Sequence, residues 1–238
     1  MKSILNIILF FIDFNHKNKI IKFFKNRFND QALTIIDVGA HVGETISLFS
    51  KNFTIKKMIC YEASKFNFNK LIKSRYLKNC NIVLNNIALG SKENELEFFQ
   101  TSESSSSTFC KIDQNSNYFK RKKNILNFFH QKEYILESEL IEIKTLKNEF
   151  MKYDLKYIDI LKIDTEGFEF DVIKGADQSL KFVNFILFEH HYDQMIIKNY
   201  KFREINDYLT KLNFKKIIKF KMPLRKTFEY IYVNENLK

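Results

Sequence analysis

The chain has 238 residues, 45% of them hydrophobic, which suits a single α/β domain with a modest insertion. Its three cysteines form no C-x-x-C pair and show no metal-ligand spacing, which argues against a disulfide scaffold and fits a reducing, cytoplasmic setting. The net charge of +11 comes almost entirely from the two ends of the chain, since residues 31–210 hold 25 basic and 24 acidic side chains. This distribution argues against a nucleic-acid enzyme, which is expected to carry a basic stripe at its catalytic core.

Residues 1–30 are predicted to be a basic, amphipathic helical extension ahead of the main domain at 31–238. The apolar stretch 1–12 has about half of the ~20 residues that a bilayer span needs, and no small-residue cleavage site follows it. Over 17–28, apolar side chains recur at helical spacing with basic residues opposite. We favour a helix packed on the domain; the alternative is a peripheral contact with the inner face of the membrane.

The segment 34–43, TIIDVGAHVG, predicts a strand, a tight turn and the start of a helix. The strand ends in Asp37, and Gly39 and Gly43 lack a Cβ, so the backbone can turn sharply and lie close to a ligand. Glu62 closes the next apolar run, where an acid is placed to bind both ribose hydroxyls of an adenosine-containing ligand. Together these features predict a nucleotide-type cofactor at the carboxyl edge of a parallel sheet.

Strand and helix patterns alternate from residue 34 onward, which predicts a parallel sheet with helices on both faces. Gly175 suits the C-terminal stop of the helix that begins near Phe168. The expected strands are 34–37, 57–62, 81–90 with its exit, 95–100, 139–146, 158–163 and 182–189. The expected helices are 44–52, 66–77, 147–153, 168–175 and 202–212, and an antiparallel pair at 214–221 and 227–233, around Pro223, closes the fold.

Residues 101–138 interrupt this alternation and are expected to form an insertion. They begin with the hydroxyl-rich loop TSESSSST at 101–108, and a basic run follows at 120–123. One interpretation is a solvated loop followed by a surface helix. The other places the insertion beside the cofactor cleft, where Ser106 and Ser107 help to seat the substrate.

Acids also follow two strands in the second half of the chain. Asp164 and Glu166 stand at the carboxyl end of the first, while Glu189 ends the second and is followed at once by His190 and His191. Acids at a strand exit that faces a cofactor turn are costly there unless they bind something. We therefore expect these side chains to act in the function of the protein.

The segments DVGAHVG, YEAS, NNIALG, SSSST, LKIDTEGFEFDVIKGA and ILFE occur in this order across residues 34–191. Together they resemble the FkbM family of methyltransferases. The resemblance implies a Rossmann-like class I methyltransferase fold, with a mostly parallel seven-stranded sheet, helices on both faces and an antiparallel closing hairpin. It also implies S-adenosyl-L-methionine as methyl donor and O-methylation of a sugar, glycan or natural-product precursor, as in surface polysaccharide biosynthesis. His41 departs from the family pattern, in which Asn is the common residue.

The positions of these residues and the resemblance together give candidates for three roles. The cofactor-binding positions are Asp37, Gly39, Ala40, His41, Gly43, Glu62, Ala63, Asn86, Ala88 and Asp164. The substrate positions are Ser106, Ser107 and Glu189. The catalytic candidates are Asp164, Glu166, His190 and His191.

A sugar hydroxyl is a very weak acid, so its methylation calls for a general base or a metal ion. Our hypothesis is that Asp164 or one of the histidines accepts the proton and that Glu166 orients the substrate or the loop. Asp164, Glu166 and Glu189 could hold a divalent cation through oxygen ligands, but no spacing in the sequence demands a metal.

Two other functions fit parts of the sequence. An NAD-type Rossmann oxidoreductase would use Glu62 equally well, although the G-x-G-x-x-G pattern is missing, and a non-catalytic scaffold could retain the fold. Methylation of nucleic acid is disfavoured, because the only proline, Pro223, is followed by leucine and forms neither an [N/D]-P-P-[Y/F] loop nor a Pro-Cys pair. We expect a small-molecule or glycan acceptor and no nucleic acid; the sequence leaves the oligomeric state open.

Overall fold

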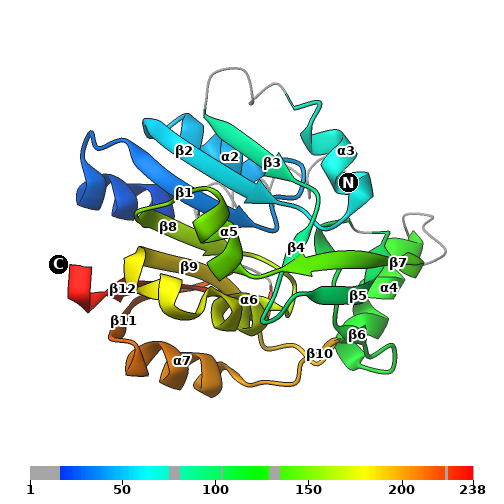
Figure 1. Cartoon of the computed structure of the whole chain (residues 1–238). Coiled ribbons are helices and arrows are strands. Elements are labelled where there is room, and N and C mark those ends of the chain that lie inside the picture. The colour runs from blue at the N-terminus through cyan, green and yellow to red at the C-terminus, as the bar shows by residue number, and fades with distance from the viewer. Residues whose placement is uncertain (1–16, 75–80, 103, 129–134, 223–224, 238) are drawn as a thin grey trace.

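The computed structural model describes residues 17–74, 81–102, 104–128, 135–222 and 225–237 (Figure 1). The predicted apolar stretch 1–12, the end of the predicted helix 66–77, and Pro223 lie outside these described residues.

A seven-stranded sheet forms the centre of the molecule, in the order β11-β12-β9-β8-β1-β2-β3 (Figure 1). Its strands are β1 (Leu33–Val38), β2 (Ile55–Tyr61), β3 (Ile82–Asn85), β8 (Ile158–Ile163), β9 (Val183–His191), β11 (Phe214–Lys221) and β12 (Thr227–Asn234). The paired strands run parallel, except that β12 is antiparallel to both of its neighbours, β9 and β11. This arrangement confirms the predicted mostly parallel sheet with an antiparallel closing hairpin.

Apolar side chains on both faces of the sheet form the core, because successive residues of a strand point to opposite faces. In β1, Leu33 and Ile35 join one buried cluster, whereas Ile36 and Val38 join the other. The described helices are the segment 17–28, α2 (Glu44–Ser50), α3 (Lys65–Leu71), α4 (Asn117–Phe128), α5 (Leu146–Lys152), α6 (Glu169–Ala176) and α7 (Phe202–Lys211). The segment 17–28, α2 and α3 pack in the first cluster, and α5, α6 and α7 pack in the second.

The helix over 17–28 buries its apolar stripe in the protein. Ile20, Ile21, Phe24 and Phe28 are all buried, and the ring of Phe24 meets the ring of Phe185 in β9 edge to face, with 5.6 Å between the centroids. Aromatic pairs of this geometry add to the free energy gained by burial. The stripe is therefore occupied by core contacts. Within the described part of the chain, no helix is long and apolar enough to span a bilayer.

Two of the expected strands lie outside the main sheet. β5 (Asn94–Thr101) pairs antiparallel with β7 (Ile135–Lys144), which also pairs with β4 (Ala88–Leu89) in a separate three-stranded sheet. The expected strict alternation of parallel strands and helices therefore fails over these residues. The first half of β5, residues 94–97, alternates partly buried and exposed residues, as a strand with one solvated face does.

The insertion continues beyond β5. It contains the 3₁₀ turn η2 (Ser104–Ser106), β6 (Lys111–Ile112) and α4, and β6 pairs with β10 (Ile196–Ile197). These elements and the second sheet lie together on the right in Figure 1. The 3₁₀ turns η3 (Asp177–Phe182) and η4 (Glu235–Leu237) complete the described elements.

Gly175 does not end α6, contrary to the sequence expectation. It lies inside the helix, which continues to Ala176, and Asp177 follows with a φ of 45°. A Cβ on Gly175 would lie 1.8 Å from the backbone oxygen of Gly90. The glycine is needed because α6 packs directly against the backbone at the exit of β4.

Candidate active site

A pocket of about 290 Å³ lies at the carboxyl ends of β1, β2, β8 and β9. The predicted site residues that line it are Gly39, Ala40, His41, Glu62, Ala63, Ala88, Ser107, Asp164, Glu166 and Glu189. The predicted residues that do not line it are Asp37, Gly43, Asn86, Ser106, His190 and His191. The carboxyl edge of a parallel sheet is where such folds bind their ligands.

The turn after β1 touches the exit of β8. Gly39 has a φ of 84°, and a Cβ there would lie 1.8 Å from the backbone oxygen of Asp164. The Asp164 N–H in turn donates to the Val38 oxygen at 2.9 Å. Gly39 is thus required by the approach of β8, and not only by a ligand as the sequence suggested. Gly43, with a φ of 98°, is the N-cap residue of α2 and does not line the pocket.

Glu62 is buried, and its carboxylate holds the turn. Its Oε2 accepts the His41 N–H at 2.7 Å, and its Oε1 accepts the Ser64 N–H at 2.9 Å. Burial raises the pKa of Glu62, and these two hydrogen bonds oppose the shift. Asn86 contacts the backbone of Glu62: its Nδ2 donates to the Glu62 carbonyl oxygen at 2.8 Å. Because its side chain is held there, Asn86 does not line the pocket.

His41 connects the turn to the insertion. Its Nδ1 lies 3.0 Å from Glu44 Oε1 and its Nε2 lies 2.8 Å from Ser104 Oγ. Burial lowers its pKa, but the hydrogen bond and charge of Glu44 outweigh this, so the pKa of His41 is raised overall. The departure from the common Asn therefore gives this chain a side chain that reaches both α2 and η2.

The hydroxyl-rich loop lies beside the pocket, as the second of the two interpretations expected. Ser107 lines the pocket, and its Oγ accepts hydrogen bonds from Gln100 Nε2 and from the Thr101 N–H at 2.9 and 3.1 Å. Ser106 is buried away from the pocket, whereas Ser104 lines it. The sequence missed Ser104, because a run of four serines gives no local signal for which hydroxyl faces the ligand.

Asp37 is completely buried in β1, next to Lys162 of β8, and it does not line the pocket. Lys162 Nζ lies 3.1 Å from Asp37 Oδ1 and 3.4 Å from Asp164 Oδ2. Burial raises the pKa of Asp37, and the Lys162 charge opposes this. Burial lowers the pKa of Lys162, but the two carboxylates outweigh it and raise that pKa. Lys162 was not among the predicted site residues, and its signal in the sequence is a lysine inside the buried strand IDILKI.

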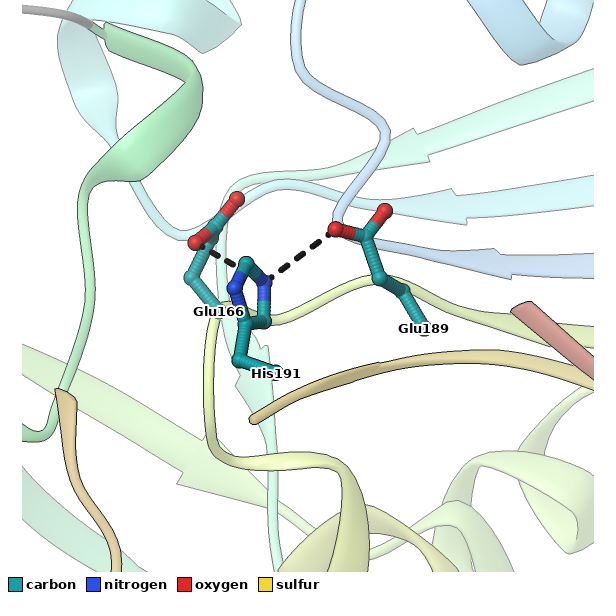
Figure 2. Close-up of side chains that lie close together, drawn as sticks. All are labelled: Glu166, Glu189 and His191. Atoms are coloured by element: carbon teal, nitrogen blue, oxygen red, sulfur yellow. Dashed lines mark ion pairs between the residues drawn. The ribbon is translucent and has the colours of Figure 1, made fainter. Parts of the chain in front are cut away.

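Two carboxylates of the pocket lining, Glu166 and Glu189, converge with the buried His191 beside the pocket (Figure 2). His191 Nε2 lies 3.2 Å from Glu166 Oε2 and 3.2 Å from Glu189 Oε1. Its other ring nitrogen, Nδ1, lies 3.3 Å from Asp193 Oδ2 and 3.2 Å from Thr227 Oγ1. Burial lowers the pKa of His191, but the surrounding carboxylates raise it well above the ordinary value. Burial also raises the pKa of Glu189, helped by the charge of Asp164.

His190 faces away from this group, because neighbouring residues of a strand point to opposite faces. Its ring packs against those of Tyr192, Tyr200 and Phe202, with centroids 4.8, 5.9 and 5.5 Å apart. Burial and the nearby charges of Lys198 and His191 lower the pKa of His190 to about 3. His190 is therefore a neutral packing residue in this structure, and its expected place beside the pocket is corrected.

Comparison with known families decides the broad class of this site. A family model for the methyltransferase FkbM domain matches residues 37–216, from the cofactor turn to β11. The chain belongs to the FkbM methyltransferase family. The match confirms the resemblance carried by the sequence motifs and makes S-adenosyl-L-methionine the cofactor; it does not support the NAD-type oxidoreductase.

Solved structures share the fold of this FkbM methyltransferase. Magnesium protoporphyrin IX methyltransferase (ChlM) from Synechocystis PCC 6803 with bound SAM has 9% sequence identity and a TM-score of 0.51, and the match covers 93% of this chain and 79% of that one. The same enzyme with bound SAH has 8% identity and a TM-score of 0.51, over 93% of this chain and 82% of that one. At these identities the likeness establishes the class I fold alone. No curated protein matches the chain.

Glu62 and the turn after β1 are the residues of this FkbM methyltransferase that could hold S-adenosyl-L-methionine. Each Glu62 oxygen accepts one backbone N–H, and a carboxylate has further lone pairs that could accept a ribose hydroxyl. Gly39, Ala40 and Ala63 contribute small or backbone surfaces beside it.

Proposed function

We propose that this enzyme is an O-methyltransferase that acts on a hydroxyl of a sugar, a glycan or a natural-product precursor, as in surface polysaccharide biosynthesis. The observation that carries the proposal is the group of carboxylates that line the pocket beyond the cofactor turn: Asp164, Glu166 and Glu189. Carboxylates accept hydrogen bonds from hydroxyl groups and can accept the proton that a hydroxyl must lose.

The residues divide into a cofactor end and an acceptor end. At the cofactor end, Glu62 and the turn at Gly39–His41 hold S-adenosyl-L-methionine, which supplies an electrophilic methyl group. At the acceptor end, Asp164 takes the hydroxyl proton, and Glu189 and Ser107 orient the acceptor. Lys162 keeps the Asp164 carboxylate at the pocket edge, since its Nζ lies 3.4 Å from Asp164 Oδ2. This arrangement supports alignment of donor and acceptor, which is the main requirement of a methyl transfer.

The first experiment is calorimetric binding of S-adenosylhomocysteine to the full chain, with NADH alongside. We expect binding of S-adenosylhomocysteine alone, weakened more than about tenfold in Glu62→Gln, because the amide can no longer accept two ribose hydroxyls and two backbone N–H groups. The control is Glu97→Gln, an exposed residue of β5. A well-folded chain that binds neither ligand would favour the scaffold function instead.

The acceptor class needs a separate test. The chain is incubated with S-adenosyl-L-methionine labelled with carbon-13 on the methyl group and with a panel of sugars, oligosaccharides and polyhydroxylated small molecules. We expect the product signal in the chemical-shift range of an O-methyl group. Transfer to nitrogen or carbon would overturn the O-methylation proposal while leaving the methyltransferase family intact.

A further inference from the structure

We propose that Glu166 and Glu189, which line the pocket, form a binding site for one divalent transition-metal cation together with the buried His191 beside them. The three side chains offer ligand atoms that all lie within 4.8 Å of one another (Figure 2). The imidazole nitrogen favours a transition-metal ion such as Zn²⁺, and the two carboxylate oxygens also suit Mn²⁺, whereas Mg²⁺ and Ca²⁺ prefer sites made of oxygen ligands alone. This set differs from the one suggested by the sequence, which was Asp164, Glu166 and Glu189. His191 takes the place of Asp164.

The distances within the group match those between neighbouring ligands of one ion. Ligand bonds of about 2.1 Å at right angles place two donor atoms roughly 3 Å apart. His191 Nε2 lies 3.2 Å from an oxygen of Glu166 and 3.2 Å from an oxygen of Glu189. Small rotations of the side chains would therefore complete three bonds to a common centre.

Two of the donor atoms are buried without a hydrogen bond. Among the described residues, Glu189 Oε1 and His191 Nε2 have no hydrogen-bond partner, although they lie 3.2 Å from each other. The two atoms approach one another as an ion pair, but no hydrogen bond of good geometry joins them. Buried polar atoms left in this state are costly, and a cation between them would remove the cost.

The second ring nitrogen of His191 is held as it is in metal-bound histidines. Nδ1 lies 3.3 Å from Asp193 Oδ2 and 3.2 Å from Thr227 Oγ1. A carboxylate that accepts the Nδ1 proton fixes the tautomer in which the Nε2 lone pair is free for a metal. In that tautomer the Nε2 lone pair faces the carboxylates of Glu166 and Glu189, and a cation between the three groups would contact all of them.

The charges around the group favour a cation. Asp193 adds a third carboxylate, whose Oδ2 lies 3.3 Å from Nδ1 of His191. A nearby cation, Lys198, donates from Nζ to the backbone oxygen of His191. A single protonated imidazole would neutralise only part of this negative charge.

The role of the ion rests on the proposed O-methylation. A cation beside Asp164 would bind the acceptor oxygen and lower the pKa of the hydroxyl, as metal ions do for bound water. The hydroxyl proton then passes to Asp164. The oxygen lone pair forms the C–O bond as the C–S bond breaks, and its electron pair stays on sulfur in S-adenosylhomocysteine.

The test uses the full chain stripped of metal by a chelator and then titrated with Mn²⁺, with electron paramagnetic resonance and calorimetry as readouts. We expect one Mn²⁺ per chain, a spin-echo coupling to an imidazole nitrogen, and loss of that coupling in His191→Gln. Glu189→Gln should weaken Mn²⁺ binding more than about tenfold. Asp159→Asn, a buried carboxylate at the other end of β8, is the matched control and should bind Mn²⁺ as the wild type does.

S-adenosylhomocysteine binding, measured on the same samples, separates this proposal from the proposed function and shows that each variant is folded. Glu189→Gln should keep S-adenosylhomocysteine affinity within about threefold, because Glu189 lies at the acceptor end. Binding of S-adenosylhomocysteine by a chain that takes up neither Mn²⁺ nor Zn²⁺ would overturn the metal site and leave the methyltransferase intact. Mn²⁺ binding without nitrogen coupling would also overturn it, because the ligand set would then be wrong.

Discussion

At the scale of single residues, Lys162 explains how acids crowd one edge of the sheet. It lies 3.1 Å from Asp37 and 3.4 Å from Asp164, so a single ammonium group contacts an acid inside β1 and the acid that follows β8. Asp37 is completely buried, while the Asp164 side chain remains 35% exposed and lines the pocket. The two acids thus differ in exposure, and only Asp164 is available for chemistry.

This difference leads to a prediction for Asp164. Replacing Asp164 with Asn should lower kcat by about 10²–10⁴-fold, because the amide keeps the shape but cannot accept the hydroxyl proton. The affinity for S-adenosylhomocysteine should change by less than about threefold. Radiolabel transfer to the identified acceptor measures kcat, and calorimetry measures affinity. An unchanged kcat would remove Asp164 as the general base.

His41 gives a prediction for the pH dependence of stability. Its pKa is raised in the folded protein, so its contribution is fully present below the unfolded pKa of about 6.5 and is lost as the pH rises through the folded value. In His41→Asn the contribution is absent at every pH. The difference in Tm between wild type and variant should therefore shrink between pH 6 and pH 9. A difference that stays constant or grows would contradict the proposed His41–Glu44 contact as its source.

At the scale of elements, strand alternation sorts the side chains at the end of β9. Glu189 and His191 are two residues apart and share one face of the strand, whereas His190 between them packs on the other. The sequence contained this information, because a strand extended through His191 would have separated the two histidines. The predicted strand ended at Glu189, whereas β9 continues through His191, so the prediction did not distinguish His190 from His191.

The contact between α6 and the exit of β4 gives a stability prediction. In Gly175→Ala the new Cβ would lie 1.8 Å from the Gly90 oxygen, so the helix must move away from the backbone. We expect a net loss of about 1–3 kcal/mol in the free energy of unfolding, although alanine is the better helix former by about 1 kcal/mol. Urea unfolding measures this, with Lys174→Ala on the same helix as the control. A variant as stable as the wild type would show that α6 has room to shift.

At the scale of the whole molecule, the sheet brings four strand ends to one edge, and the insertion covers part of it. The turn after β1, Glu62 after β2, Asp164 after β8 and Glu189 in β9 all line the same pocket. The insertion reaches that edge through Ser104, which contacts His41 across 63 positions of sequence. The two ends of the pocket and the insertion that covers part of it are therefore built from segments that are far apart along the chain.

The sequence by itself determined the parts whose signals are local. The strand–turn–helix over 34–43, the acid at Glu62 and the closing hairpin are each encoded within a few residues, because chain reversal and strand patterning depend on neighbours. The motifs in their order also determined the family. These predictions needed no knowledge of packing.

Only the tertiary structure decided which side chains meet. It placed Lys162 between two acids, put Ser104 instead of Ser106 at the pocket, moved β5 and β7 into a second sheet, and joined His191 to Glu166. The physical reason is that such contacts depend on strand register and on how the insertion packs, and neither is encoded in the residues on either side. A buried charge receives its function from the partner that the fold brings to it.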